Sequence, residues 1–183
     1  IMAVNNKTYN NVVNFMARLG QYHEQIATVS VGDIYDVAIS KDLKMPLLHI
    51  NPVNVTTGDS ELVYNFQIFI MDLVDTDMGT EVKPVADLTK LINQDNNQQE
   101  VWNNTLNIAT DFIGMLRHSS RQSLAGVNDI NYPIYFTQDQ FTIDPFQERF
   151  DDLASGWVVN IGVKVMNDFD TCEIPVSTNG AGY

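Results

Sequence analysis

Apolar residues recur along the chain at two different spacings, and these separate the predicted helices from the predicted strands. Spacings of three and four residues predict amphipathic helices over residues 8–19, which Gly20 should end, and over residues 99–117. Runs of β-branched and aromatic residues predict strands over residues 28–39, 47–55 and 61–73. The last of these alternates most regularly. The chain up to residue 117 therefore predicts a helix, three strands and a second helix.

Glycine and proline residues interrupt two of these predicted strands. Gly32 and Asp33 break the alternation of the first strand, which predicts a bulge or a short turn. Pro52 cannot donate to a ladder, so the second strand is expected to lie at an edge, or to end or bulge at this proline. The turn residues 57–60 then predict an antiparallel hairpin with the third strand.

The last third of the chain returns to strand character. Short aromatic runs over residues 132–136 and 141–146 and a longer alternating stretch over residues 157–165 predict strands, with a turn at residues 151–156. Strands on both sides of a helix predict an α+β fold, an antiparallel β-sheet with two helices packed on one face.

The predicted elements fill one domain over residues 1–183. We expect a compact core over about residues 8–166, a polar loop over residues 75–98 and a C-terminal tail over residues 167–183. No apolar run approaches the roughly 20 residues that cross a bilayer, and the first residues do not resemble a signal peptide. We therefore expect no membrane partner.

The charge of the chain bears on whether it binds nucleic acids. Ten basic residues stand against 23 acidic residues, which gives a formal net charge of −13 and a pI near 4.3. Such a domain is repelled by phosphate backbones, so sequence-specific nucleic-acid binding is not expected. The acidity either serves solubility or forms a surface past which DNA must slide without sticking.

The residues that carry chemistry are scattered along the sequence. No phosphate-binding loop and no nucleophile elbow occurs, and Cys172 is the only cysteine. His23, His49 and His118 are far apart, and His49 is expected to be a partly buried, hydrogen-bonded residue and not a metal ligand or a general base. We therefore predict that the chain is not an enzyme and has no cofactor.

One acidic group is a weak candidate for a metal site. Asp75, Asp77 and Glu81 follow Asp72 near the end of the strongest predicted strand. Their spacing resembles an oxygen-ligand calcium loop, but the distal glutamate of such a loop is missing. A solvated acidic loop is the favoured interpretation, and no metal is predicted.

Several segments, taken in order, resemble a family of bacteriophage proteins. They are the N-terminal helix, the strand entry Met45-Pro46-Leu47-Leu48-His49-Ile50, the strand ending Ile70-Met71-Asp72-Leu73-Val74-Asp75, the second helix and the closing block over residues 146–157. Over about residues 8–166, the chain resembles the tail-terminator and tail-completion proteins of tailed bacteriophages and the neck proteins that share their fold.

The resemblance implies a structural virion protein without covalent chemistry. It implies a ring of six or twelve copies at the head–tail connector or the tail terminus, with DNA passing through the lumen. The implied partners are other connector, portal-side or tail proteins. The implied location is the virion tail or neck, after assembly in the cytoplasm of the host bacterium.

Two other functions stay open at this stage. The aromatic segment over residues 132–146 could serve a monomeric binding module for a glycan or a peptide, whereas in a ring Tyr135, Phe136 and Phe141 would form an interface arm. A hydrolase or calcium-dependent enzyme would have to use Asp72, Asp75 and Asp77.

Overall fold

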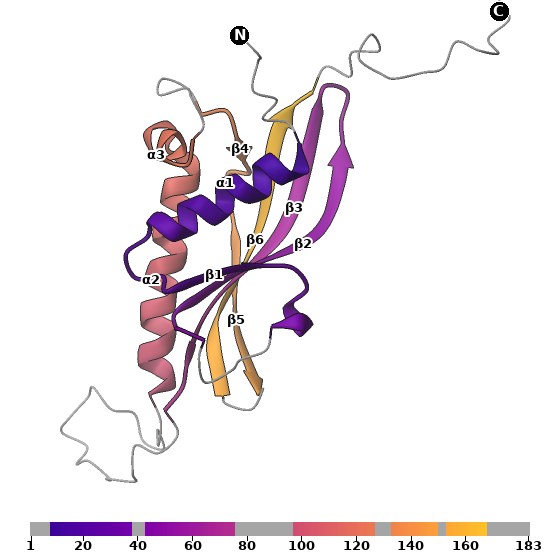
Figure 1. The fold of residues 1–183 in the computed structure, drawn as a ribbon. Coiled ribbons are helices and arrows are strands. Elements are labelled where there is room, and N and C mark those ends of the chain that lie inside the picture. The colour runs from indigo at the N-terminus through magenta and orange to yellow at the C-terminus, as the bar shows by residue number, and fades with distance from the viewer. Residues whose placement is uncertain (1–7, 38–42, 76–96, 127–132, 150–152, 168–183) are drawn as a thin grey trace, which may run out of the picture.

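The computed structural model describes residues 8–37, 43–75, 97–126, 133–149 and 153–167. Helices lie over one face of a single mixed sheet (Figure 1). The elements in chain order are α1 (Tyr9–Tyr22), β1 (Thr28–Val31), the 3-10 helix η1 (Ile34–Asp36), β2 (Leu47–Thr57), β3 (Glu61–Leu73), α2 (Gln98–Arg117), α3 (Ser119–Leu124), β4 (Phe136–Thr137), β5 (Thr142–Arg149) and β6 (Leu153–Met166).

The strand order of the sheet is β1-β2-β3-β6, with β4 and β5 both on the outer side of β6. The fold class predicted from the sequence, α+β, is confirmed. The prediction of a wholly antiparallel sheet is wrong at one pair, because β1 runs parallel to β2 while the other pairs are antiparallel. A parallel neighbour needs a connection of a dozen or more residues, and residues 32–46 provide it.

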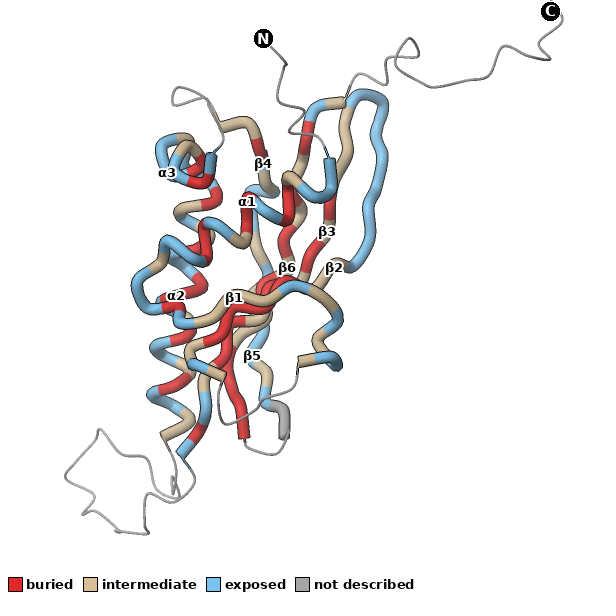
Figure 2. Tube along the Cα trace, viewed as in Figure 1, coloured by how far each residue is buried: buried red, intermediate tan, exposed pale blue. Residues whose placement is uncertain are grey.

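The main core lies between the sheet and the two long helices. Alternate residues of β3 and β6 are buried on this face, which we call the helix face, and Figure 2 shows the buried positions where α1 and α2 cover the sheet. Their partners come from the predicted apolar stripes of the helices. The core cluster includes Phe15, Met16, Leu19, Tyr64, Phe66, Ile68, Ile70, Ile108, Phe112, Leu116, Val159, Ile161 and Val163.

The helix α1 begins where the sequence predicts and ends later. The hydroxyl of Thr8 accepts the N–H of Asn11 at 3.3 Å and caps the helix. The sequence predicted that Gly20 would end the helix, and this prediction is wrong. Gly20 is buried within α1, which continues to Tyr22. A Cβ atom at this position would lie 3.0 Å from Cγ2 of Val29. This glycine therefore allows a close approach of α1 to β1.

The interruptions predicted in the first two strands are present. Gly32 ends β1 with a φ of 142°, a conformation that favours glycine, and the side chain of Asp33 then caps η1. The register of β2 against β3 shifts between Pro52 and Asn54, as in the bulge that Pro52 predicted. The hairpin between β2 and β3 closes with a hydrogen bond from Gly58 N to Glu61 O at 2.9 Å.

The start of β6 corrects one prediction. Residues 153–156 were expected to be part of a turn, but they are buried strand residues paired with β3 and β5. Gly156 is needed for close packing, because a Cβ atom there would lie 1.8 Å from the carbonyl oxygen of Ile70. A glycine that permits strand contact resembles a turn glycine when only the sequence is read.

Candidate functional site

The second half of β2 is a free edge of the sheet within the described part of the chain. The paired stretch with β1 ends at Ile50, where Gly32 N donates to Ile50 O at 3.1 Å. Beyond this point Val53 and Val55 are 51% and 48% exposed. Alternate residues of an edge strand direct backbone hydrogen-bonding groups away from the sheet. We call this exposed part of β2, which carries Val53 and Val55, the β2 edge.

The opposite side of the same sheet is a second edge, made of β4 and β5. The two strands pair with different ends of β6, β5 with residues 153–160 and β4 with residues 163–164. Pro145 lies within β5 and has no N–H to donate, which limits uncontrolled pairing there. The fold therefore presents two unlike edges on opposite sides of one sheet.

The three predicted interface aromatics have different surroundings on this second edge. Tyr135 is 2% exposed and its ring centroid lies 4.5 Å from that of Phe15, so the core encloses it. Phe141 lies beneath the guanidinium of Arg117, at 4.6 Å. Phe136 is 43% exposed on β4. A role of this segment at an interface therefore depends on Phe136.

A buried glutamine, which the sequence analysis missed, fastens the aromatic segment to the helices. Gln122 in α3 has no exposed surface, and its Nε2 donates to Leu116 O and Tyr135 O, both at 2.8 Å. Its Oε1 accepts the N–H groups of Ile134 and Tyr135, at 3.0 and 3.2 Å. A glutamine in a short polar helix gives no sequence signal of such burial.

His49 is hydrogen-bonded, as predicted, and it is buried more completely than the partial burial that the sequence suggested. Its Nδ1 lies 2.8 Å from the hydroxyl of Ser30, and its Nε2 lies 3.0 Å from Gly32 O. Because a carbonyl can only accept, Nε2 carries the hydrogen and Nδ1 accepts from Ser30. Burial lowers the pKa of His49 below its ordinary value of 6.5. The imidazole thus ties the end of β1 to β2 in its neutral form.

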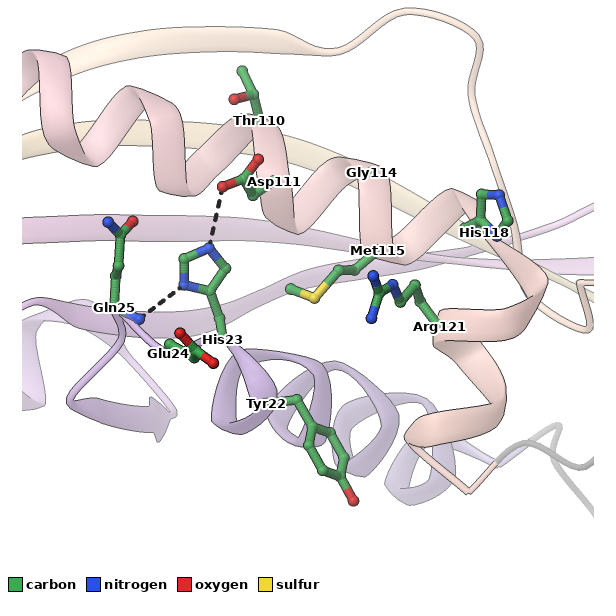
Figure 3. A pocket seen from close by; sticks show the side chains of 10 residues that line it. All are labelled: Tyr22, His23, Glu24, Gln25, Thr110, Asp111, Gly114, Met115, His118 and Arg121. Atoms are coloured by element: carbon green, nitrogen blue, oxygen red, sulfur yellow. Dashed lines mark hydrogen bonds and ion pairs between the residues drawn. The ribbon is translucent and has the colours of Figure 1, made fainter.

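The other two histidines line one groove of about 570 Å³ between α1, α2 and α3 (Figure 3). Nδ1 of His23 accepts the N–H of Gln25 at 3.2 Å, so Nε2 faces the carboxylate of Asp111 at 3.4 Å. Both nitrogens are thus engaged at the C-cap of α1.

A nucleophile activated by this pair is not found among the described lining residues. The hydroxyl of Thr110, next to Asp111, donates to Asn107 O at 2.8 Å. His118 lies at the far end of the groove, where its Nδ1 is 2.9 Å from the hydroxyl of Ser120 (Figure 3). The groove lies where the three helices meet, and its described lining residues do not combine a nucleophile with the His23–Asp111 pair.

Only some of the acidic residues that were candidates for a metal site lie in the described part of the chain. Asp77, Glu81 and Cys172 lie outside the described residues. Asp75 follows β3, and its backbone N–H donates to Oδ1 of Asn97 at 2.8 Å. Asp72 accepts the N–H of Leu73 at 2.8 Å, and burial raises its pKa above the ordinary value of 3.8. Among the residues that the structure describes, no three metal-ligating side chains gather.

The face of the sheet opposite the helices, which we call the open face, carries a row of amides across three strands. Asn51, Gln67 and Asn160 stand level in the register of β2, β3 and β6. Asn51 Nδ2 donates to Gln67 Oε1 at 3.2 Å, and Gln67 Nε2 donates to Asn160 Oδ1 at 3.4 Å. The sequence carries a signal for this amide row, since Asn65 and Gln67 alternate with the apolar positions of β3.

No protein-family model matches the chain, and no curated protein matches it significantly. None of the helices in the described ranges is long and apolar enough to cross a membrane.

Proposed function

We propose that this chain is a structural subunit of a tailed-bacteriophage virion, which forms a ring of six or twelve copies around the DNA channel at the head–tail connector or the tail terminus. The proposal begins from the resemblance of the sequence to tail-terminator and neck proteins. Two helices on one face of a sheet, in the order that the resemblance implies, are consistent with it.

The observation that carries the proposal is the pair of unlike edges on opposite sides of one sheet. When one copy presents the β2 edge to the β4–β5 edge of the next, the contact is heterologous, and such contacts generate closed rings when the rotation between copies is suitable. Val53 and Val55 are exposed, and the adjoining backbone has no strand partner on that side among the described residues, which favours strand addition. The described residues between Val53 and Thr57 include no charge that would oppose it.

The charge of the chain supports a position next to DNA. A net charge of −13 on each copy gives a ring wall that repels the phosphate backbone, so DNA can pass without being held. The proposed partners in the virion are other connector, portal-side or tail proteins. The alternative of a monomeric binding module built on residues 132–146 has less support, because the protein's own core and Arg117 engage Tyr135 and Phe141.

The test is a lysine placed on the β2 edge. Val55→Lys adds a charge to a half-exposed side chain and should not disturb the core. We expect the wild type to give ring particles by electron microscopy and sedimentation, and Val55→Lys to sediment as a monomer at the same protein concentration.

The matched control is Leu124→Lys in α3, because Leu124 is exposed to a similar degree but belongs to a helix and not to an edge strand. This variant should assemble like the wild type. Assembly of Val55→Lys that equals that of Leu124→Lys would overturn the assignment of the β2 edge.

A further inference from the structure

The open face of the sheet carries a groove of about 510 Å³. Its lining residues come from η1, the bulge of β2, β3 and β5, and include Asp33, Tyr35, Asn51, Gln67, Phe69 and Phe146. The volume lies within the roughly 300–1,000 Å³ that is common for small-molecule sites. The groove shares Val53 with the β2 edge, and it shares Phe146 and Gln147 with the β4–β5 edge.

One wall of the groove offers unused amide groups. An amide side chain has two N–H donors and a carbonyl oxygen with two lone pairs. Asn51 uses one N–H on Gln67, and Gln67 uses one N–H on Asn160. Among the described residues, one further N–H on each side chain and the carbonyl oxygen of Asn51 face no protein partner. The hydrogen bonds of the amide row therefore hold Asn51 and Gln67 in place. One N–H of each side chain and the carbonyl oxygen of Asn51 remain for hydrogen bonds to a ligand.

The charges of the described residues around the groove disfavour an anionic ligand. The lining residues in the described ranges include no lysine or arginine, and Asp33 is the one carboxylate among them. Oδ1 of Asp33 accepts the N–H of Tyr35 at 3.0 Å, which holds the carboxylate at the start of η1. Phosphates, nucleotides and acidic sugars would meet this negative charge without a compensating cation among these residues. Hydroxyl groups, in contrast, can donate to a carboxylate and exchange hydrogen bonds with amides.

Aromatic rings supply the apolar part of the site. Tyr35 lines the groove and is 87% exposed. Phe69 and Phe146 also line it, and their rings meet edge to face with centroids 5.4 Å apart. Rings of this kind present flat apolar surfaces to the C–H groups of a ligand, while the amides and the carboxylate bind its polar rim.

We propose that this groove binds a neutral saccharide, with a sugar ring against Tyr35 and its hydroxyls on Asn51, Gln67 and Asp33. The inference goes beyond the proposed ring and does not depend on it. A neutral polyhydroxylated ring matches the groove in charge, hydrogen-bonding groups and apolar surface. The aromatic contribution comes from Tyr35, Phe69 and Phe146. Phe146 lies at the end of the segment over residues 132–146 that the sequence suggested for glycan or peptide binding, whereas Tyr35 and Phe69 lie outside that segment.

The experiment is saturation-transfer NMR on the full chain with glucose, galactose, N-acetylglucosamine and maltose as probes, followed by titration of each sugar that shows transfer. We expect transfer to at least one of these sugars. Tyr35→Ala should weaken its binding about tenfold, the loss that accompanies removal of a stacked ring. Glucose 6-phosphate and lysine, which carry opposite charges, serve as mismatched probes and should show weaker transfer than the neutral sugars.

The matched control is Tyr22→Ala, because Tyr22 is an exposed aromatic residue on α1, away from the open face. It should bind sugar like the wild type, and circular dichroism should show that both variants are folded. The proposal is overturned if no probe sugar shows transfer, if Tyr35→Ala and Tyr22→Ala bind equally, or if lysine alone binds. Val55→Lys should bind sugar normally whether or not it assembles, so this test and the ring test fail independently.

Discussion

Replacing Gln122 by alanine tests how the aromatic segment is held to the helices. The change removes a side chain that makes four hydrogen bonds to backbone groups, two as donor and two as acceptor. The N–H and C=O of Tyr135 both belong to a residue that is 2% exposed, so water does not replace the lost partner. An unsatisfied buried group costs about 1–3 kcal/mol. With two such groups, we expect Gln122→Ala to lower the free energy of unfolding by about 4 kcal/mol. This is a large part of the roughly 5–15 kcal/mol that stabilises a domain.

The assay is urea unfolding of Gln122→Ala followed by the fluorescence of Trp102 and Trp157. The half-buried indoles lie 6.3 Å apart between centroids, in the region where α2 meets β6. Gln21→Ala, an exposed change on α1, should stay within about 0.5 kcal/mol of the wild type. A loss below about 1 kcal/mol for Gln122→Ala would refute the reasoning, because it would mean that the backbone groups of Tyr135 find other partners.

Three further predictions concern the sheet and the core. Gly156→Ala should lower the free energy of unfolding by about 3 kcal/mol or more in urea titrations, because β3 and β6 must separate; a loss within experimental error would contradict the close strand contact. The pKa of His49 is lowered in the folded state, so its contribution to the free energy of unfolding should be complete above pH 6.5. This contribution should fall as the pH is lowered below that value. His49→Gln should flatten this part of the stability profile, and an unchanged slope would show that other groups cause it. Burial raises the pKa of Tyr135 to about 12, so stability should fall as the pH rises from 10 towards 12, and Tyr135→Phe should reduce this alkaline loss in thermal melts. An alkaline loss equal in Tyr135→Phe and the wild type would assign it to other tyrosines.

The sequence predicted the elements that carry a local signal. Helical spacing located α1 and α2, alternation located β3 to the residue, and Pro52 marked the register shift of β2. These features depend on neighbouring residues in the chain, and local pattern therefore suffices to predict them.

The features that sequence reasoning missed depend on contacts between distant residues. Gly20 and Gly156 were read as a helix end and part of a turn, but both permit close packing against residues far away in the chain. The parallel pairing of β1 was missed because the direction of a neighbour is not encoded in the strand itself. The open-face groove combines η1 with three strands, and no single segment reveals it.

The most direct test of the proposed ring is the molar mass of the purified wild-type chain by light scattering, over a range of protein concentrations and at low and high salt. We predict a closed species of six or twelve times the 20.6 kDa of one chain. Because strand pairing and apolar contact hold the ring, its mass should persist at high salt, where repulsion between acidic copies is screened. A monomer at every concentration and salt would contradict the self-assembling ring.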